Sequence, residues 1–311
     1  MLVGPGSGLP GPGRLLAGRH IARPQAQGLL PAATLARIDQ VAGVREASFR
    51  ARDGAVLGYR ELPPARRGLR YAVQRREDGM SFSLEFDGDA APPPDGRARG
   101  TVVLLHGWGL DGTGMLPWAL ALSERGYHAI VPDLRGHGRS RDASPGFGPR
   151  EGADVAGLLA ALRDEDRPPG PVLLPGVSHG AAAALHAGAL LGEGVAGIVA
   201  VSPYAGAAQG IRGVVGAAAR MQGGGLRERA ARAWMRRRYT PGAVEAAMRD
   251  AGRRMGVDLG SIQTGPPVDA LRACTLVMHG SQDGVFALAD VEALRGARRW
   301  RALSCSKVRT T

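Results

Sequence analysis

The chain has 311 residues, of which 44% are hydrophobic and 22% charged, and its formal net charge is +12. This composition excludes a disordered chain, the length suffices for a well-buried core, and no run approaches the ~18 apolar residues of a membrane-spanning helix. The two cysteines, Cys274 and Cys305, are too few for a disulfide framework and lack the spacing of a zinc site.

Residues 1–42 are rich in glycine, proline and alanine and contain no acidic residue before Asp39. They lack the apolar block of a secretory signal. Early arginines without acids are also typical of an organellar targeting peptide, but Ser7 is the only hydroxyl residue before Thr34. We predict a disordered tail, which a start codon placed too far upstream would explain, rather than a targeting peptide, and we expect a cytoplasmic protein.

Short strands are predicted next, over residues 46–60 and 69–87. Apolar and polar side chains alternate from Ser81 to Phe86, which favours a half-buried antiparallel strand. Proline and glycine between residues 90 and 100 indicate a loop.

From Thr101 onward the sequence contains five short apolar runs, at 101–107, 128–133, 171–177, 195–203 and 274–280. Continuous runs without alternation are typical of strands covered on both faces. Helix-length segments separate the first four runs, at 113–126, 151–166 and 179–192. This order predicts an α/β fold with a mostly parallel central sheet flanked by helices.

The fourth and fifth runs are separated by a segment too long for a simple crossover. We predict a helical insertion over residues 207–269, which divides the core into a first part at 43–206 and a second part at 270–311. Residues 226–237 within it have the pattern of an amphipathic helix. Eleven arginines against three acids lie between residues 207 and 255. Because the rest of the likely core is near neutral, we interpret them as a solvated surface or a preference for anionic substrates, and expect no nucleic-acid partner.

Polar side chains occur where the predicted strands end, at His106, Asp133, Ser178, Ser202 and His279. In a parallel sheet, ligands bind beyond the carboxyl ends of the strands. The sharpest motif is the segment 176–180, which reads Gly-Val-Ser-His-Gly between an apolar strand and an alanine-rich helix. The two flanking glycines permit a tight strand-to-helix turn, and the first amides of the helix favour developing negative charge.

Three ordered motifs carry a family resemblance: His-Gly-Trp-Gly at 106–109, Asp-Leu-Arg-Gly-His-Gly-Arg-Ser at 133–140 and the serine turn. Residues 279–283, His-Gly-Ser-Gln-Asp, add a strand end that carries an acid. From about Thr101 to Phe286 the chain resembles the α/β-hydrolase fold superfamily, near its serine esterases, lipases and peptidases.

The resemblance implies roles for individual residues. Ser178 would be the nucleophile and Asp283 the acid of the triad, while the backbone amides of Trp108 and His179 would form an oxyanion hole. The insertion would be a cap over the substrate pocket. Candidate pocket residues are His106, Tyr204 and Trp234, each of which is equally well a core residue. No cofactor is implied, and no cluster has metal-ligand spacing.

The catalytic histidine of this superfamily follows the acid, yet no histidine follows His279. The last strand and helix of the fold are also expected to be missing. A truncated or frameshifted end, a non-catalytic relative, or a relocated base at His106 or His137 would each explain this. Without a base the serine hydroxyl is a weak nucleophile.

The sequence therefore predicts a serine-dependent hydrolase of ester, thioester or amide bonds in a small-molecule acyl substrate, working through an acyl-enzyme and impaired if the base is absent. An acyltransferase, or a hydrolase-like protein that only binds its ligand, are the alternatives. Oligomeric state and the identity of the substrate are not determined by these patterns.

Overall fold

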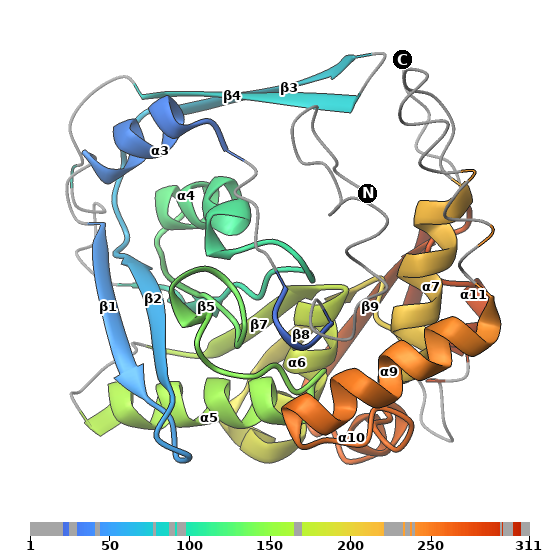
Figure 1. Cartoon of the computed structure of the whole chain (residues 1–311). Coiled ribbons are helices and arrows are strands. Elements are labelled where there is room, and N and C mark those ends of the chain that lie inside the picture. Colours follow the sequence, from blue (N-terminus) through green and yellow to red (C-terminus); the bar gives the residue numbers. More distant parts are fainter. Residues whose placement is uncertain are drawn as a thin grey trace.

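The computed structural model describes residues 21–24, 30–40, 44–76, 79–86, 91, 98–164, 170–220, 233, 237, 240–292, 294 and 301–305. Its centre is an eight-stranded sheet with the order β1-β2-β6-β5-β7-β8-β9-β10 (Figure 1). The strands are, in that order, Arg45–Arg50, Val56–Leu62, Tyr127–Pro132, Gly100–Val103, Val172–Val177, Gly197–Val201, Cys274–Gly280 and Arg301–Cys305. Strands β1, β2 and β6 pair antiparallel, and the remaining neighbours pair parallel. The predicted α/β fold with a mostly parallel central sheet is thus confirmed.

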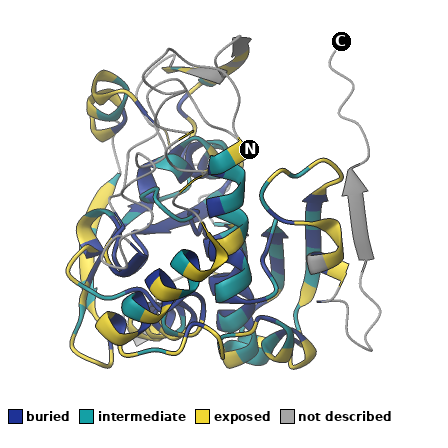
Figure 2. Ribbon diagram, turned by 45° about the vertical axis from the view of Figure 1, so that its right-hand side comes forward, coloured by how far each residue is buried: buried dark blue, intermediate teal, exposed yellow. Residues whose placement is uncertain are grey.

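The continuous apolar runs form strands that are covered on both faces. Val103 packs into a cluster with helices α5 (Pro149–Asp164) and α6 (His179–Leu191), whereas its neighbour Val102 packs into a cluster with α4 (Leu116–Glu124). Successive side chains of a strand point to opposite faces, so both faces of the sheet are apolar. Figure 2 shows buried residues along the strands and on the helix sides that face them.

Residues 21–24 and 30–40, the described parts of the predicted disordered tail at 1–42, are packed against the fold; the rest of that tail lies outside the described residues. Ile21 and Ala22 are each 5% exposed, and Ile38 of α3 (Ala32–Asp39) is fully buried. The glycine- and proline-rich composition of residues 1–42 concealed these few apolar side chains, which pack in the core. Strands β3 (Leu69–Arg76) and β4 (Gly79–Phe86) form a separate antiparallel pair.

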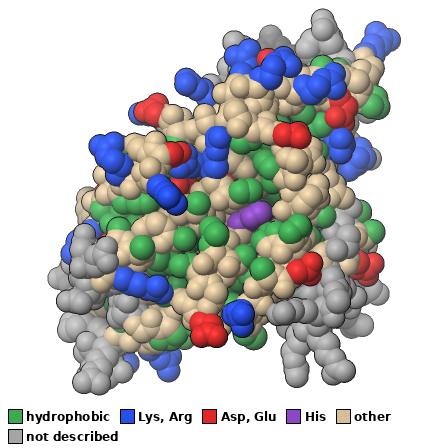
Figure 3. Space-filling model, turned by 90° about the horizontal axis from the view of Figure 1, so that it is seen from below, with side chains coloured by type: hydrophobic (Ala, Val, Ile, Leu, Met, Phe, Trp, Pro, Cys, Tyr) green, Lys and Arg blue, Asp and Glu red, His purple; other side chains and the backbone are tan. Residues whose placement is uncertain are grey.

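Among the described residues of the region predicted as an insertion, the helices that follow β8 are α7 (Ala207–Arg220), α9 (Pro241–Met255) and α10 (Gly265–Asp269). Most of the amphipathic stretch 226–237, with Trp234, lies outside the described residues. On the face drawn in Figure 3, basic and acidic side chains are interspersed around a largely apolar middle. Within the part of the chain that the structure describes, no helix is long and apolar enough to cross a membrane.

The expectation that the last strand is missing was wrong. After the short helix α11 (Leu288–Glu292), strand β10 pairs parallel with β9, from Arg301 opposite Leu276 to Cys305 opposite Gly280. Its mixed sequence, Arg-Ala-Leu-Ser-Cys, lacks the continuous apolar run that identifies strands covered on both faces, because β10 is at the edge of the sheet. The predicted absence of the last helix is not tested, because residues 306–311 after β10 are not among those described.

Candidate active site

Ser178 occupies a tight turn between β7 and α6, with φ 53° and ψ −110°. A left-handed φ at a residue with a side chain costs about 1–3 kcal/mol and persists only when its surroundings fix it. Here the Ser178 N–H donates to the carbonyl of Val201 on β8 at 2.8 Å, and its own carbonyl accepts from Ala181 and Ala182 in α6. One strand further, Ser202 also has a positive φ and donates its N–H to Met278 of β9.

The two glycines of the serine motif are required by close backbone approaches. A Cβ atom on Gly176 would overlap the backbone carbonyl of Gly180, and one on Gly180 would overlap the carbonyl of Leu105. The strand, the turn and the start of α6 therefore pack backbone to backbone. This explains the Gly-x-Ser-x-Gly spacing and how the turn projects the serine from the sheet edge.

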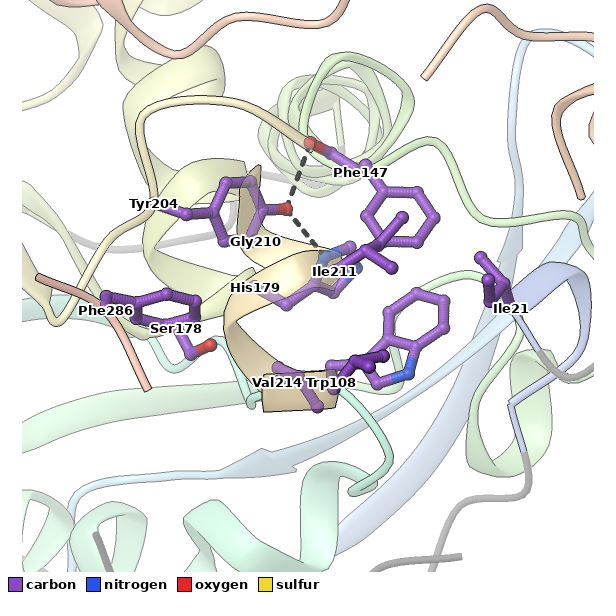
Figure 4. Close-up of a pocket in the computed structure, with 11 residues that line it drawn as sticks. Ile21, Trp108, Phe147, Ser178, His179, Tyr204, Gly210, Ile211, Val214 and Phe286 are labelled. Carbon is purple, nitrogen blue, oxygen red and sulfur yellow. Dashed lines mark hydrogen bonds between the residues drawn. The ribbon is translucent and has the colours of Figure 1, made fainter. Parts of the chain in front are cut away.

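Ser178 lies at the wall of a mainly apolar pocket of about 30 Å³ (Figure 4). The lining is contributed by residues 21–24, the loops after β5, β6, β8 and β9, the serine turn at the start of α6, and helix α7. The described lining residues are Ile21, Trp108, Phe147, Ser178, His179, Tyr204, Gly210, Ile211, Val214, Val215 and Phe286. Of the predicted pocket residues, Tyr204 is in this set, His106 is not, and Trp234 is outside the described residues.

A buried polar network lies directly behind the serine turn. The Tyr204 hydroxyl donates to the carbonyl of Phe147 at 3.1 Å, so it accepts a hydrogen from Nδ1 of His179, also at 3.1 Å. The other ring nitrogen of His179, Nε2, is 3.6 Å from Oε1 of Glu151. All three polar side chains are buried. The His179 side chain is therefore engaged behind the turn and not with the Ser178 hydroxyl.

Glu151 is a fully buried carboxylate that also holds the loop around Phe147. Its Oε1 accepts from the Gly146 N–H at 2.6 Å and its Oε2 from the Gly148 N–H at 2.7 Å. Burial raises the pKa of Glu151, but the contact with His179 and the two backbone donors outweigh burial and lower that pKa to about 2. Burial, with the nearby Glu151 charge, raises the pKa of Tyr204 well above its ordinary value. Glu151 is thus charged and Tyr204 neutral at physiological pH.

The Trp108 side chain forms the opposite side of this cluster. It stacks on Phe147 with the ring centroids 4.5 Å apart, and it meets His137 and His179 edge to face at 5.0 and 5.2 Å. The aromatic contacts connect the loop after β5 to the first residue of α6. Among the described residues, no acceptor is recorded for the backbone N–H of Trp108 or of His179, the two amides predicted to form an oxyanion hole.

His106 and His137 have structural partners on both ring nitrogens. Nδ1 of His106 donates to the Gly107 carbonyl and its Nε2 accepts from the Leu134 N–H. Nδ1 of His137 donates to the Arg135 carbonyl and its Nε2 accepts from the Gly109 N–H. Burial lowers the pKa of both rings.

Each of these rings is therefore neutral and bonded to two loops. The alternative that His106 or His137 replaces the missing base is not supported by these contacts. Both rings instead hold the turns in which they lie.

Asp133 likewise fixes the loops at the end of β6. Its carboxylate accepts from the backbone N–H groups of Gly112 at 2.6 Å and of Arg139 at 3.0 Å. Arg135, two residues later, bridges the carboxylates of Asp53 and Asp154. The motif at 133–140 thus holds three loops together.

Asp283 lies in the turn after β9 and is half-buried. Its Oδ1 accepts from the backbone N–H groups of Val285 and Phe286, at 2.8 and 3.2 Å, and Phe286 packs in the pocket wall with Ser178. His279 is bonded through Nε2 to the Phe286 carbonyl at 3.1 Å. In the described part of the chain no imidazole bonds to Asp283. The same part contains no group of His, Cys, Asp and Glu able to hold a metal ion.

A sequence model of the alpha/beta hydrolase family matches residues 102–308, a range that includes the serine turn and Asp283. The chain belongs to the alpha/beta hydrolase family. This match covers more than half of the chain and agrees with the strand order and with the position of Ser178 between β7 and α6.

Solved structures share the fold of this hydrolase-family chain. The esterase Pf2001 of Pyrococcus furiosus is 16% identical with a TM-score of 0.57, over 91% of this chain and 87% of the esterase. A second crystal form of the esterase gives 17% identity and a TM-score of 0.55, over 91% and 86%. The protein AbyA5 is 17% identical with a TM-score of 0.52, over 88% of this chain and 64% of AbyA5. No curated protein matches the chain.

The sequence did not identify most of the pocket wall of this alpha/beta hydrolase, and Ile21, Phe147 and Glu151 show why. Ile21 belongs to a segment without a recognisable pattern, and Phe147 has a positive φ in a loop. Glu151 is in the first turn of α5, where an acidic residue is usually solvated and stabilises the helix end. The one available signal was the run of Gly146 and Gly148 just before it, whose free N–H groups suit a carboxylate.

Proposed function

We propose that this alpha/beta hydrolase family member is a serine-dependent hydrolase that cleaves ester, thioester or amide bonds through an acyl-enzyme. The observation that carries the proposal is the left-handed turn at Ser178, which presents a hydroxyl to an apolar pocket at the start of α6. A fold of this family without such a turn would have no nucleophile at this edge of the sheet.

In this proposal the Ser178 Oγ attacks the carbonyl carbon of the substrate. The carbonyl oxygen becomes an oxyanion that accepts hydrogen bonds from the amides of Trp108 and His179, each worth about 3 kcal/mol in comparable sites. The N-terminal end of α6 adds the favourable field of its dipole. When this adduct collapses, the bond from the carbonyl carbon to the leaving alcohol, thiol or amine breaks, that group departs with a proton, and the acyl group stays on the Ser178 Oγ. Water then attacks the acyl-enzyme, which releases the carboxylic acid and restores the Ser178 hydroxyl. Helices α7 and α9 act as a cap that limits the access of solvent.

The proton of the Ser178 hydroxyl requires an acceptor. We propose Asp283 as the acid that would orient an imidazole, and we expect slow turnover because no described imidazole bonds to it. Serine hydrolases that lack a triad member retain roughly 10³–10⁴-fold acceleration over water from the oxyanion hole and binding. Reactive probes and activated esters are therefore the substrates on which Ser178 should be detected first.

A fluorophosphonate probe tests the proposal. We expect covalent labelling of the full chain, with the modified peptide containing Ser178, and loss of labelling in Ser178→Ala. The matched control is Ser202→Ala, which removes a serine at the next strand end that also has a positive φ but does not line the pocket. Labelling that survives in Ser178→Ala, or that is lost equally in both variants, would refute the assignment of the nucleophile.

The same chemistry admits two other outcomes. If the labelled protein consumes an activated ester faster when an alcohol or amine is added, and the acyl group is recovered on that acceptor, the chain is an acyltransferase. If the protein binds the ester without any covalent adduct at Ser178, it is a hydrolase-like binding protein. Mass spectrometry of protein and product distinguishes these outcomes from hydrolysis.

A further inference from the structure

The pocket is bounded by a side chain from outside the central fold. Ile21, in the segment before β1, is 5% exposed and lines the pocket together with Ser178. It belongs to the apolar cluster that contains Phe147, Ile211 and Val215. Figure 4 places Ser178 and Ile21 at opposite ends of the lining, with Trp108 and Ile211 drawn between them.

The position of Ile21 is held by several contacts. Ala22 is as buried as Ile21 and belongs to the same cluster, which also includes side chains of α9 such as Met248. Two residues further, Pro24 approaches Gly136 so closely that a Cβ there would lie 3.2 Å from its ring. Residues 21–24 therefore form a packed wall between the loop after β6 and the helices that follow β8.

The chemistry of the lining selects an apolar ligand. His179 and Tyr204 are the polar side chains beside Ser178. They hydrogen-bond to each other, Tyr204 also donates to the Phe147 carbonyl, and Nε2 of His179 faces Glu151 at 3.6 Å. The other described lining residues are glycine, aliphatic or aromatic. A charged or strongly polar acyl group would lose its hydration here without a compensating partner.

The size of the pocket limits the length of that ligand. Its volume of about 30 Å³ has room for roughly two water molecules, so a long acyl chain would either meet the wall at Ile21 or extend out of the pocket into solvent. We infer that the site accepts short, apolar acyl groups and that Ile21, at the end opposite Ser178, determines the longest chain that fits. This inference rests on the proposed function of Ser178.

The inference is tested with a series of p-nitrophenyl esters: acetate, butyrate, hexanoate and octanoate. The measured rate is the release of p-nitrophenolate, counting only the part that Ser178→Ala abolishes. The wild-type chain should react faster with acetate and butyrate than with octanoate. Removing methyl and methylene groups from a pocket changes discrimination by about tenfold or more. Ile21→Ala should therefore raise the octanoate-to-butyrate rate ratio at least tenfold, and the milder Ile21→Val should raise it less.

Ile38→Ala is the matched control, because it removes the same atoms from a fully buried isoleucine of α3 in a different apolar cluster. It should leave the ratio unchanged even if it lowers stability. An equal change of ratio in Ile21→Ala and Ile38→Ala, or an unchanged ratio in both Ile21 variants, would overturn the inference.

Failure of the proposed function gives a different result. If no ester releases p-nitrophenolate in a Ser178-dependent way, the pocket is tested directly with 1-butanol and 1-octanol by calorimetry on the Ser178→Ala chain. Preference for butanol, reversed by adding Ile21→Ala, would support the chain-length limit without any catalysis. A preference for octanol in both proteins would reject it.

Discussion

The buried carboxylate of Glu151 gives the most quantitative prediction. Glu151→Gln keeps the shape of the side chain but replaces one oxygen by an NH₂ group. Each oxygen now accepts from a glycine N–H, at 2.6 Å from Gly146 and 2.7 Å from Gly148. The amide would therefore place a donor against one of these donors, and the contact with Nε2 of His179 would lose its negative partner.

The magnitude follows from the pKa. In the folded chain the pKa of Glu151 is lowered from 4.5 to about 2, and this difference corresponds to about 3 kcal/mol of stability when the group is ionised in both states. Breaking a buried pair by removing one partner independently costs about 3–5 kcal/mol in other proteins. We expect Glu151→Gln to lower the free energy of unfolding near neutral pH by about 3 kcal/mol.

The pH dependence has a definite sign. A folded-state pKa below the unfolded value means that the carboxylate stabilises the fold above about pH 4.5 and that this stability is lost as the pH falls toward about 2. Glutamine does not titrate. The difference in the free energy of unfolding between the wild type and Glu151→Gln should therefore be constant near neutral pH and become smaller below about pH 4.5. The other acidic groups titrate in both proteins, so their contributions cancel when the free energies of unfolding are subtracted.

Urea unfolding at a series of pH values measures this difference. Glu245→Gln is the control, because Glu245 forms an exposed ion pair with Arg212, a class worth about 0–1 kcal/mol. If Glu151→Gln stays within 1 kcal/mol of the wild type at neutral pH, or if its effect does not depend on pH, the reasoning from the buried carboxylate is refuted.

Two substitutions test the geometry around Ser178. Gly180→Ala would push a methyl group into the Leu105 carbonyl. We therefore expect loss of fluorophosphonate labelling, and thermal unfolding should show a loss of stability of about 1–3 kcal/mol. Normal labelling would contradict the close approach. Tyr204→Phe leaves the Nδ1–H of His179 and the Phe147 carbonyl buried without the tyrosine hydroxyl, so the free energy of unfolding should fall by about 1–3 kcal/mol. An unchanged midpoint of urea unfolding would show that water replaces the hydroxyl.

The sequence was informative about the interior of the sheet for a physical reason. Strands β5 and β6 are buried on both faces, which forces continuous apolar residues. The predicted run at 128–133 matches β6, whereas only the first part of the run at 101–107 is in β5, which ends at Val103. The serine turn was equally legible. A Cβ atom at Gly176 or Gly180 would overlap backbone atoms, so only glycine fits at those positions. The constraint is local, and the five consecutive residues 176–180 are enough to identify it.

Features that depend on partners distant in sequence were not predictable in the same way. Ile21 is one apolar residue in a segment without periodicity, and its burial depends on helices nearly two hundred residues later in the chain. From the sequence alone, Glu151 is typical of a solvated acidic residue in the first turn of a helix. Its burial becomes apparent only from its partners, which are Gly146 and Gly148 in the preceding loop and His179 at the start of α6. Strand β10 was missed because an edge strand needs no continuous apolar run.

The backbone bonds at the strand ends have a consequence for how this protein can vary. Ser178 is tied to Val201, and Ser202 to Met278, so the ends of β7, β8 and β9 form one continuous backbone unit. Residues 207–269 lie between β8 and β9 in the sequence and are not part of that backbone unit. Helices there are free to be exchanged, shortened or reshaped during evolution or engineering, while the separation between the serine turn and the Asp283 turn stays fixed by the sheet.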